Sequence, residues 1–358
     1  MTACRTSAPQ RVAEFPDMHV EANPNATDAW DGYDAEMLYE RGINFFDAHQ
    51  FSEAIPYFVK VIDEFPESPE FKPAHYYVAL SYIELEDGTN ALLFIDSFIR
   101  LIPHNDRSTV YHEALLKRAI ALSILQDYDA LVESMETLID IAQRPEHLIQ
   151  AHTNAGIGLF MLERYDEASS HLLATRRLYR NASRLSQGTT HFFMAQATFY
   201  LAEISREEFE RVQLQPESSA SETSSIDMKR VSAQLEIKCQ RLFIAQSAYF
   251  RVIREKHAGW AAASGFQIGR MYEVLYEDLI GLPLPEDLNE EERQLYQQTL
   301  HKRITILLQK AFNAWKANLD MATRTGTDNV WVQQTEERME RLNELLQERA
   351  VATPLLEG

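Results

Sequence analysis

Hydrophobic and small residues recur at fixed distances along the first half of this chain. Counted from residue 42, the offsets 0, 3, 12, 16 and 24 hold a small residue, an aromatic residue, a small residue, an aromatic residue and a proline: Gly42, Phe45, Ala54, Phe58 and Pro66. Apolar positions three or four residues apart mark one face of a helix, and proline ends a helix. The pattern therefore predicts a hairpin of two helices over residues 35–69.

The same spacing returns three more times. Its first, small residue moves from position 42 to 79, 119 and 156, in steps of 37, 40 and 37 residues. The third copy is degenerate, because a glutamine stands where the proline is expected. The residues that carry the later copies are Ala79, Tyr82, Ala91, Ile95, Phe98 and Pro103, then Ala119, Leu122, Leu131, Met135, Leu138 and Gln143, then Gly156, Leu159, Ala168 and Leu172.

These offsets resemble those of the tetratricopeptide repeat (TPR), whose ideal period is about 34 residues. A TPR hairpin cannot bury its own apolar face, so successive hairpins stack into a right-handed superhelix with a concave groove. The resemblance implies an all-α, TPR-like solenoid over residues 35–214. It also implies a protein that binds other proteins, since TPR arrays mostly do so.

Composition and periodicity divide the rest of the chain. Residues 1–34 carry three prolines and no helical period, which predicts a flexible tether, and the Ser/Glu-rich residues 215–227 predict a loop. A fifth helix over about 191–214 begins in register but does not continue as a repeat. Residues 228–349 predict long helical hairpins that continue and cap the solenoid, with a capping box at Asn289 and Glu292, followed by a tail over 350–358. The whole of 35–349 then holds about twelve helices.

The charge balance bears on the partners. Acidic residues outnumber basic ones by 54 to 34, for a formal net charge of −20. Such a surface repels phosphate backbones, so no nucleic-acid partner is expected. It would favour a basic partner, or it serves solubility alone. No run of 18 apolar residues predicts a transmembrane helix.

Patterns that carry chemistry are scarce. The chain has no HExxH, no Gly-rich phosphate loop and no GxSxG, so we expect no catalytic residues, no metal site and no cofactor. His147 and His152 stand five residues apart, roughly 140° around a helix, and so do not share a metal easily. Cys239 lies in a helical stretch and is expected to pack as a small hydrophobic residue.

The TPR resemblance implies a binding groove on the first helix of each hairpin. Positions 2, 5, 9, 12 and 13 of that helix face the groove in the family. A helical or extended segment of another protein could lay its apolar face there, with aromatic residues as anchors. The residues at such positions are Tyr39, Ile43, Phe46, Tyr76, Leu80, Ile83, Ile157, Phe160 and Phe199.

Two stretches also suggest a cellular setting. The segment 36–110, with AIPYFVKVIDEFPESP, resembles the opening repeats of BamD-type TPR lipoproteins of the bacterial outer membrane. The later AQATFYLAEI, AQSAYFRVI and GFQIGRMYEVLYEDL are similar to TPR proteins of envelope and gliding-motility complexes in myxobacteria and their relatives. Both groups are typically lipid-anchored or periplasmic, which implies a bacterial cell-envelope assembly.

The residues before Cys4 fit that setting. Small residues precede Cys4, as at the end of a lipoprotein signal, although the charged and apolar regions that come before such a site are missing. If translation starts upstream of Met1, Cys4 is a possible lipidation site and the protein is periplasmic and anchored through its tether. If it starts at Met1, the match is a coincidence of four residues in a cytoplasmic protein.

Two other functions remain open at this point. A cytoplasmic TPR regulator or co-chaperone would need Lys, Arg and Asn in the groove to clamp a peptide carboxylate, and the groove positions are apolar or uncharged. An enzyme on a helical-repeat scaffold would need a catalytic constellation. The favoured function is a non-enzymatic scaffold or adaptor.

Overall fold

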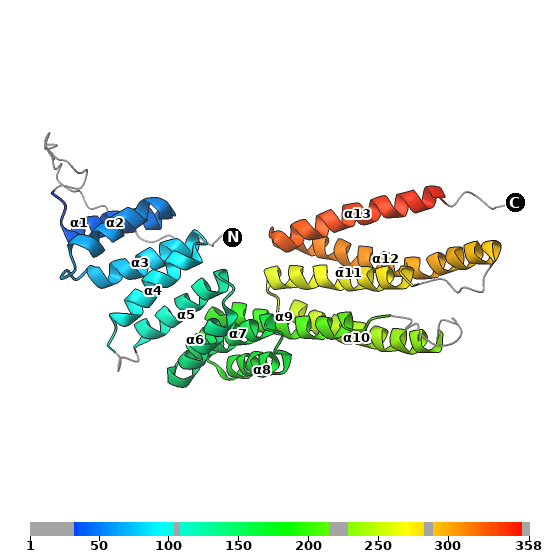
Figure 1. Ribbon diagram of the computed structural model, residues 1–358, viewed down its shortest axis with the longest axis horizontal. Coiled ribbons are helices and arrows are strands. Elements are labelled where there is room, and N and C mark those ends of the chain that lie inside the picture. Colours follow the sequence, from blue (N-terminus) through cyan, green and yellow to red (C-terminus); the bar gives the residue numbers. More distant parts are fainter. Residues whose placement is uncertain (1–31, 104–107, 215–227, 283–288, 353–358) are drawn as a thin grey trace, which may run out of the picture. The chain divides into compact units, whose positions relative to one another are not determined.

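The computed structural model describes residues 32–103, 108–214, 228–282 and 289–352. Within these ranges it holds thirteen α-helices and no strand (Figure 1). The first eight are α1 (Ala35–Asp47), α2 (Phe51–Glu64), α3 (Phe71–Glu84), α4 (Gly88–Arg100), α5 (Thr109–Ile124), α6 (Tyr128–Ile141), α7 (Pro145–Met161) and α8 (Tyr165–Asn181). The last five are longer: α9 (Arg184–Glu210), α10 (Met228–Arg254), α11 (Ala258–Ile280), α12 (Glu290–Thr325) and α13 (Val330–Ala352).

The helices divide into two compact units, with α1 to α6 in the first and α7 to α13 in the second. Within each unit every helix packs against the next one along the chain, and each odd-numbered helix also packs against the next odd-numbered one. Among the described residues no two even-numbered helices of a unit meet. Each unit is therefore a two-layer stack whose odd-numbered helices form the inner, concave layer, which is the arrangement of TPR hairpins.

One turn recurs in the first four hairpins. Seven residues after the small residue of each copy, a residue other than glycine adopts a left-handed conformation, with φ between 57 and 59°. The next N–H donates to a carbonyl oxygen five residues back, at 2.9 Å in all four copies. The left-handed conformation costs such a residue about 1–2 kcal/mol, so packing of the two helices maintains the turn. The four residues are His49, Glu86, Gln126 and Glu163.

The two helices of a hairpin meet through the first and fourth positions of the repeat. A Cβ atom added to Gly42 would lie 2.7 Å from the ring of Phe58, and one added to Gly156 would lie 2.7 Å from Leu172. Both large partners are fully buried. The small residue and the large side chain that packs against it are therefore 16 positions apart in the sequence.

The long hairpin of α11 and α12 uses the same device with a larger partner. Trp315 is fully buried, and a Cβ atom on Gly269 would lie 2.1 Å from its Nε1. That Nε1 also donates to the carbonyl oxygen of Phe266 at 3.0 Å. Asn318 donates through Nδ2 to the Ala262 carbonyl and to Thr335 Oγ1, each at 3.0 Å, which ties α12 to α11 and to α13. The helix α13 closes this end of the stack.

The fold class is confirmed: the described chain is all-α and built from stacked hairpins. The capping box at Asn289 and Glu292 is present. The expected number of helices was one too low, and the fifth expected helix begins at Arg184 rather than near 191. The hydroxyl of Ser183 accepts a hydrogen bond from Ser186 N and so begins α9 earlier. Residues 1–31 of the expected tether, the loop 215–227 and the end of the tail lie outside the described residues.

Candidate partner-binding sites

The residues expected to line a groove do stand on the inner layer, on α1, α3, α7 and α9. Eight of the nine are half-buried rather than exposed. Part of the surface of these side chains packs against neighbouring helices. The ring of Tyr39 contacts Phe58 of its own hairpin and Tyr77 of the next, with centroids 5.6 and 5.9 Å apart. Phe160 likewise contacts Tyr200 of α9. Tyr39 and Phe160 therefore hold successive hairpins together, and only part of each ring remains accessible to a partner.

One of the nine is wrong. Phe199 is 3% exposed and belongs to the core of the second unit, where its ring packs against Tyr249 and Trp260. The register that placed it in a groove assumed a regular fifth hairpin. Because α10 and α11 are long and pack over α9, they cover the position that a regular repeat would leave open.

Tyr76 lies at a hollow of about 700 Å³ in the first unit. The hollow is formed where α3 begins, α4 ends and α5 begins, and we call it the α3–α5 hollow. Phe98 and Ile102 contribute apolar side chains from the end of α4, and Val110 from the first turn of α5. The ring of Tyr76 contacts that of Phe98 with centroids 5.1 Å apart. Val110 is 54% exposed, so this hollow has an apolar rim in contact with solvent.

The polar groups at this hollow are few. Burial, with a smaller contribution from the Glu113 carboxylate, raises the pKa of Tyr76 to about 12. The phenol is therefore neutral at physiological pH. Lys72 lines the hollow and is exposed at its edge. The hollow can thus take apolar side chains, with one cation, Lys72, and one anion, Glu113, in its lining.

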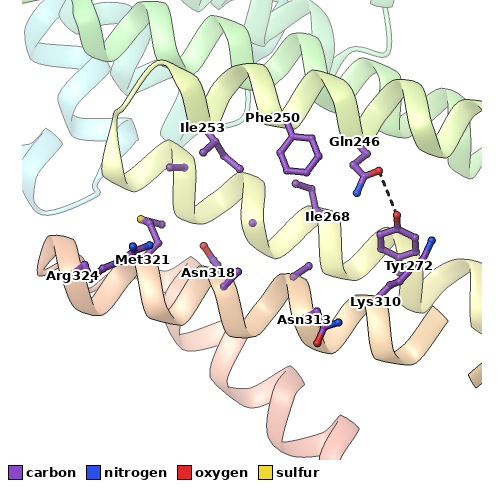
Figure 2. Close-up of a pocket in the computed structure, with 14 residues that line it drawn as sticks. Gln246, Phe250, Ile253, Ile268, Tyr272, Lys310, Asn313, Asn318, Met321 and Arg324 are labelled. Carbon is purple, nitrogen blue, oxygen red and sulfur yellow. Dashed lines mark hydrogen bonds between the residues drawn. The ribbon is translucent and has the colours of Figure 1, made fainter. Parts of the chain in front are cut away.

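A second hollow, of about 510 Å³, lies in the second unit between α10 and α12, with α11 as its floor (Figure 2). We call it the α10–α12 hollow. The floor includes two small residues, Ala261 and Gly265, and their size leaves the hollow open. Phe250 and Met321 lie at its walls. Because even-numbered helices do not meet, such a gap between outer helices is a regular consequence of the stack.

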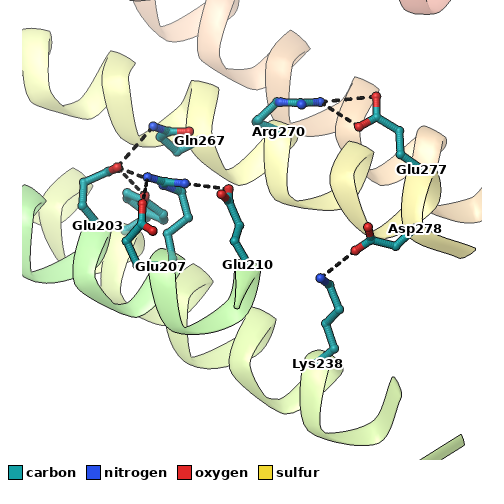
Figure 3. A network of polar contacts seen from close by, with 10 residues as sticks. Glu203, Glu207, Glu210, Lys238, Gln267, Arg270, Glu277 and Asp278 are labelled. Atoms are coloured by element: carbon teal, nitrogen blue, oxygen red, sulfur yellow. Dashed lines mark hydrogen bonds and ion pairs between the residues drawn. The ribbon is translucent and has the colours of Figure 1, made fainter. Parts of the chain in front are cut away.

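A buried polar network joins α9, α10 and α11 (Figure 3). Burial raises the pKa of the Glu203 carboxyl, and one of its oxygens accepts from the hydroxyl of the fully buried Tyr249. The other oxygen accepts from Arg206 Nε at 2.9 Å and from Gln267 Nε2 at 3.5 Å. Each oxygen of this carboxylate is therefore engaged within the protein, and the network joins helices rather than presenting a reactive group.

A buried cation, Lys238 of α10, lies near the C-terminal end of α9. Lys238 is 2% exposed, and its Nζ lies 2.6 Å from Asp278 Oδ2 and 2.7 Å from the Val212 carbonyl oxygen. It also lies over the ring of Phe209, 4.7 Å from the centroid. Figure 3 shows the contact with Asp278 bridging α10 and α11. The second unit is thus held by polar contacts between helices as well as by its apolar core.

The histidines that the structure describes lie apart or in pairs, and Cys239 lies away from them. His147 is buried, while His152 pairs with His171 of α8, with Nδ1 atoms 3.1 Å apart. No group of three metal-ligating side chains occurs among the described residues. Cys239 is free and packs against the core at intermediate exposure, as expected, and Cys4 lies outside the described residues. No helix of the described chain is long and apolar enough to cross a membrane.

Sequence reasoning missed both hollows as sites. The repeat register drew attention to the middle of each first helix, whereas the α3–α5 hollow is made at helix ends. A usable signal was present for the α10–α12 hollow: large apolar residues seven apart on α10, next to arginines in an otherwise acidic chain.

The recurring turn, the pairing of small and large residues and the two-layer packing decide the fold. The chain is an all-α, TPR-like solenoid. No protein-family model matches it, and no curated protein matches it.

Several solved structures are similar in outline. The apo form of RapI shares 11% sequence identity, covering 88% of this chain and 99% of its own, with a TM-score of 0.48. A Rap protein complexed with competence and sporulation factor shares 13% identity over 88% and 76%, with a TM-score of 0.41. A tetratricopeptide repeat protein from Parabacteroides merdae shares 13% over 86% and 98%, with a TM-score of 0.38. At these values no property of those proteins transfers to this one.

Proposed function

We propose that this solenoid is a non-enzymatic adaptor that binds a segment of another protein. The observation that carries the proposal is the α3–α5 hollow, a preformed apolar depression with an exposed rim in the first unit. Its volume of about 700 Å³ lies within the range of binding sites for drug-sized groups, and so accommodates a few large side chains. A preformed surface loses little conformational entropy when it binds.

The expected occupant is a helical or extended segment with large apolar residues. Tyr76 supplies half-buried aromatic surface, and aromatic residues dominate the energetics of protein interfaces.

The chain offers a matched pair of substitutions to test this. Val110 and Leu93 are 54% and 57% exposed in the same unit, but only Val110 lines the hollow. The tagged protein, expressed from its own locus, is crosslinked and purified with its partners, and these are quantified by mass spectrometry. We expect Val110→Glu to lose the partners at least tenfold, because it buries a charge in the interface, and Leu93→Glu to keep them. Equal recovery with both variants would contradict the proposal.

We also propose the bacterial cell envelope as the setting, with a lipid anchor at Cys4. The support is the resemblance of the 36–110 and later segments to envelope TPR proteins. The test is mass spectrometry of the N-terminal peptide from the native organism. An acylated Cys4 at the mature N-terminus is the expected result, and an unmodified Cys4 that follows an intact Met1 would overturn it.

A further inference from the structure

The outer face of α10 exposes more apolar surface than a solvated helix needs. Four large side chains on it are 45–55% exposed, and they fall in two pairs seven residues apart, which places each pair on one line along the helix. Contiguous apolar surface of this kind marks an interaction site more often than a solvated face. The four residues are Ile237, Phe243, Ile244 and Phe250.

This face runs into the α10–α12 hollow. Phe250 lines that hollow and also a neighbouring depression of about 570 Å³, to which Phe243 and Ile244 belong. The floor of the hollow is apolar along α11, from Ala261 to Ile268. Figure 2 shows Phe250 and Ile253 on the α10 side and Met321 on the α12 side of this space. The exposed face of α10 thus borders the hollow between α10 and α12 at Phe250, and we call the face and the hollow together the groove.

The groove is basic in a protein of net charge −20. Residues 230–254 contain five basic side chains and one acidic one, and residues 302–324 repeat these numbers. Four of the cations line the groove, and in the part of the chain that the structure describes none of them forms an ion pair with a carboxylate. They are Arg251, Arg254, Lys310 and Arg324. By contrast, Arg206 and Arg270 of the same unit are each paired with glutamates.

We propose that this groove binds an acidic amphipathic helix of a partner protein. Its apolar stripe would cover Phe250 and fill the hollow, and its carboxylates would meet the unpaired arginines and lysine at the walls. Two parallel helix walls over an apolar floor fit a third helix laid between them. This site is independent of the α3–α5 hollow.

Charge also selects against the other occupants. An isologous dimer through this face would set the same basic helix against its own copy, which is repulsive. A membrane with anionic lipids would also attract a surface of basic and apolar side chains. However, it presents a flat surface, and the apolar floor of the groove lies between its two walls.

The test uses two matched double variants of the full-length protein. Phe250→Ala with Arg254→Glu changes an exposed apolar and an exposed basic residue four apart on α10. Leu173→Ala with Arg177→Glu does the same on α8, where Leu173 is 51% exposed. The probe is a displayed library of helix-forming peptides about 18 residues long, panned on each protein, with selected peptides measured by fluorescence anisotropy at two salt concentrations.

We expect wild-type protein to select peptides with glutamate or aspartate around an apolar stripe. Their affinity should fall at least tenfold in the α10 variant, fall with salt, and remain unchanged in the α8 variant and in Val110→Glu. Selection of basic or neutral peptides, or equal binding by the α10 variant, would overturn the proposal. So would failure to select any peptide, a dimer in sedimentation that the α10 variant dissolves, or flotation with phosphatidylserine vesicles that only the α10 variant loses.

Discussion

The short helices α1–α6 and the long helices α9–α13 each form a two-layer stack, but different contacts stabilise the two stacks. In the first region the contact within a hairpin is a small residue against a large apolar one, as with Gly42 and Phe58. In the second region a glycine again accommodates a large ring, but that ring also donates a hydrogen bond, and buried cations and amides link neighbouring helices.

The difference follows from helix length. A hairpin of 13-residue and 14-residue helices needs only a few interdigitated side chains to fix its register. Helices of 23 and 36 residues present many near-equivalent apolar registers to each other, and buried polar contacts specify one of them. Stability in the first region therefore depends on shape, and in the second on shape together with satisfied polar groups.

The largest expected effect tests the contact that the two regions share. Trp315→Ala removes a fully buried ring and its hydrogen bond, and should lower the free energy of unfolding of the second unit by about 3–5 kcal/mol. Phe58→Ala should cost the first unit a similar amount. Hydrogen exchange read helix by helix assigns each loss to its unit. A loss below about 1 kcal/mol for Trp315→Ala would mean that this hairpin does not depend on the ring.

The next effect separates a buried ion pair from an exposed one. Lys238→Met leaves the Val212 carbonyl and Asp278 without their buried partner, and should cost about 1–3 kcal/mol by urea denaturation. The control is Lys60→Met in α2, which breaks the Lys60–Glu64 pair within one helix and should cost at most about 0.5 kcal/mol. Equal costs would remove the contrast between the two regions.

Glycine substitutions probe the close contacts of the repeats. Gly42→Ala places a methyl group against Phe58 and should destabilise the first unit by about 1–3 kcal/mol. Gly188 lies inside α9 with open space around it, so Gly188→Ala should stabilise the second unit by about 0.5–1 kcal/mol. Thermal melts of the two variants should therefore shift in opposite directions, and a gain from Gly42→Ala would show that Phe58 moves aside.

A pH dependence is expected in the second unit. Burial, with help from the nearby His171 and Arg177 charges, lowers the pKa of His152 to about 4, whereas an unfolded histidine titrates near about 6.5. The unfolded state thus binds more protons between these values, so stability is full above pH 6.5 and falls as the pH drops towards 4. Because His152 is only half-buried, we expect a loss of about 1–2 kcal/mol.

The check is urea denaturation at pH 7 and pH 4.5. His152→Gln should flatten the difference between the two values, while a wild-type slope that persists in this variant would place its origin elsewhere.

The smallest effect concerns a left-handed residue between two helices, of which each region contains an example. Gln126 in the first unit and Lys256 in the second have φ of 58° and 61°. Glycine adopts this conformation without strain but has a more flexible unfolded state, so either residue changed to glycine should gain about 0–1 kcal/mol. Ser123→Gly, in the last turn of α5, should instead cost about 0.5 kcal/mol. A loss at Gln126 would indicate that its side chain contributes to the turn.

Much of the first region was predictable because its contacts are local. The spacing from Gly42 to Phe58 lies within one hairpin, and the same spacing identified the hairpins that contain Ala79, Ala119 and Gly156. Helix boundaries with a recognisable cap, such as Asn289, were also predictable, whereas the cap at Ser183 was overlooked and the start of α9 was misplaced.

The candidate sites were predicted less well. Tyr76 lines a hollow, although its role in binding stays a prediction, and Phe98 and Val110 come to the same hollow from two other helices. Phe199 was placed in a groove and is buried, because the burial of a side chain depends on which later helix covers it. No pattern within one helix contains that information.

The sequence by itself determined the helices, the hairpin repeat and the pairs of small and large residues, because each depends on residues within about forty positions of one another. Only the tertiary structure decided which apolar faces remain open and where charge collects. The net charge of −20 favours a basic partner, yet Arg254 of α10 and Lys310 of α12, more than fifty residues apart, lie along one groove. Local periodicity determines what a helix can bury, and packing between distant helices determines what it does bury.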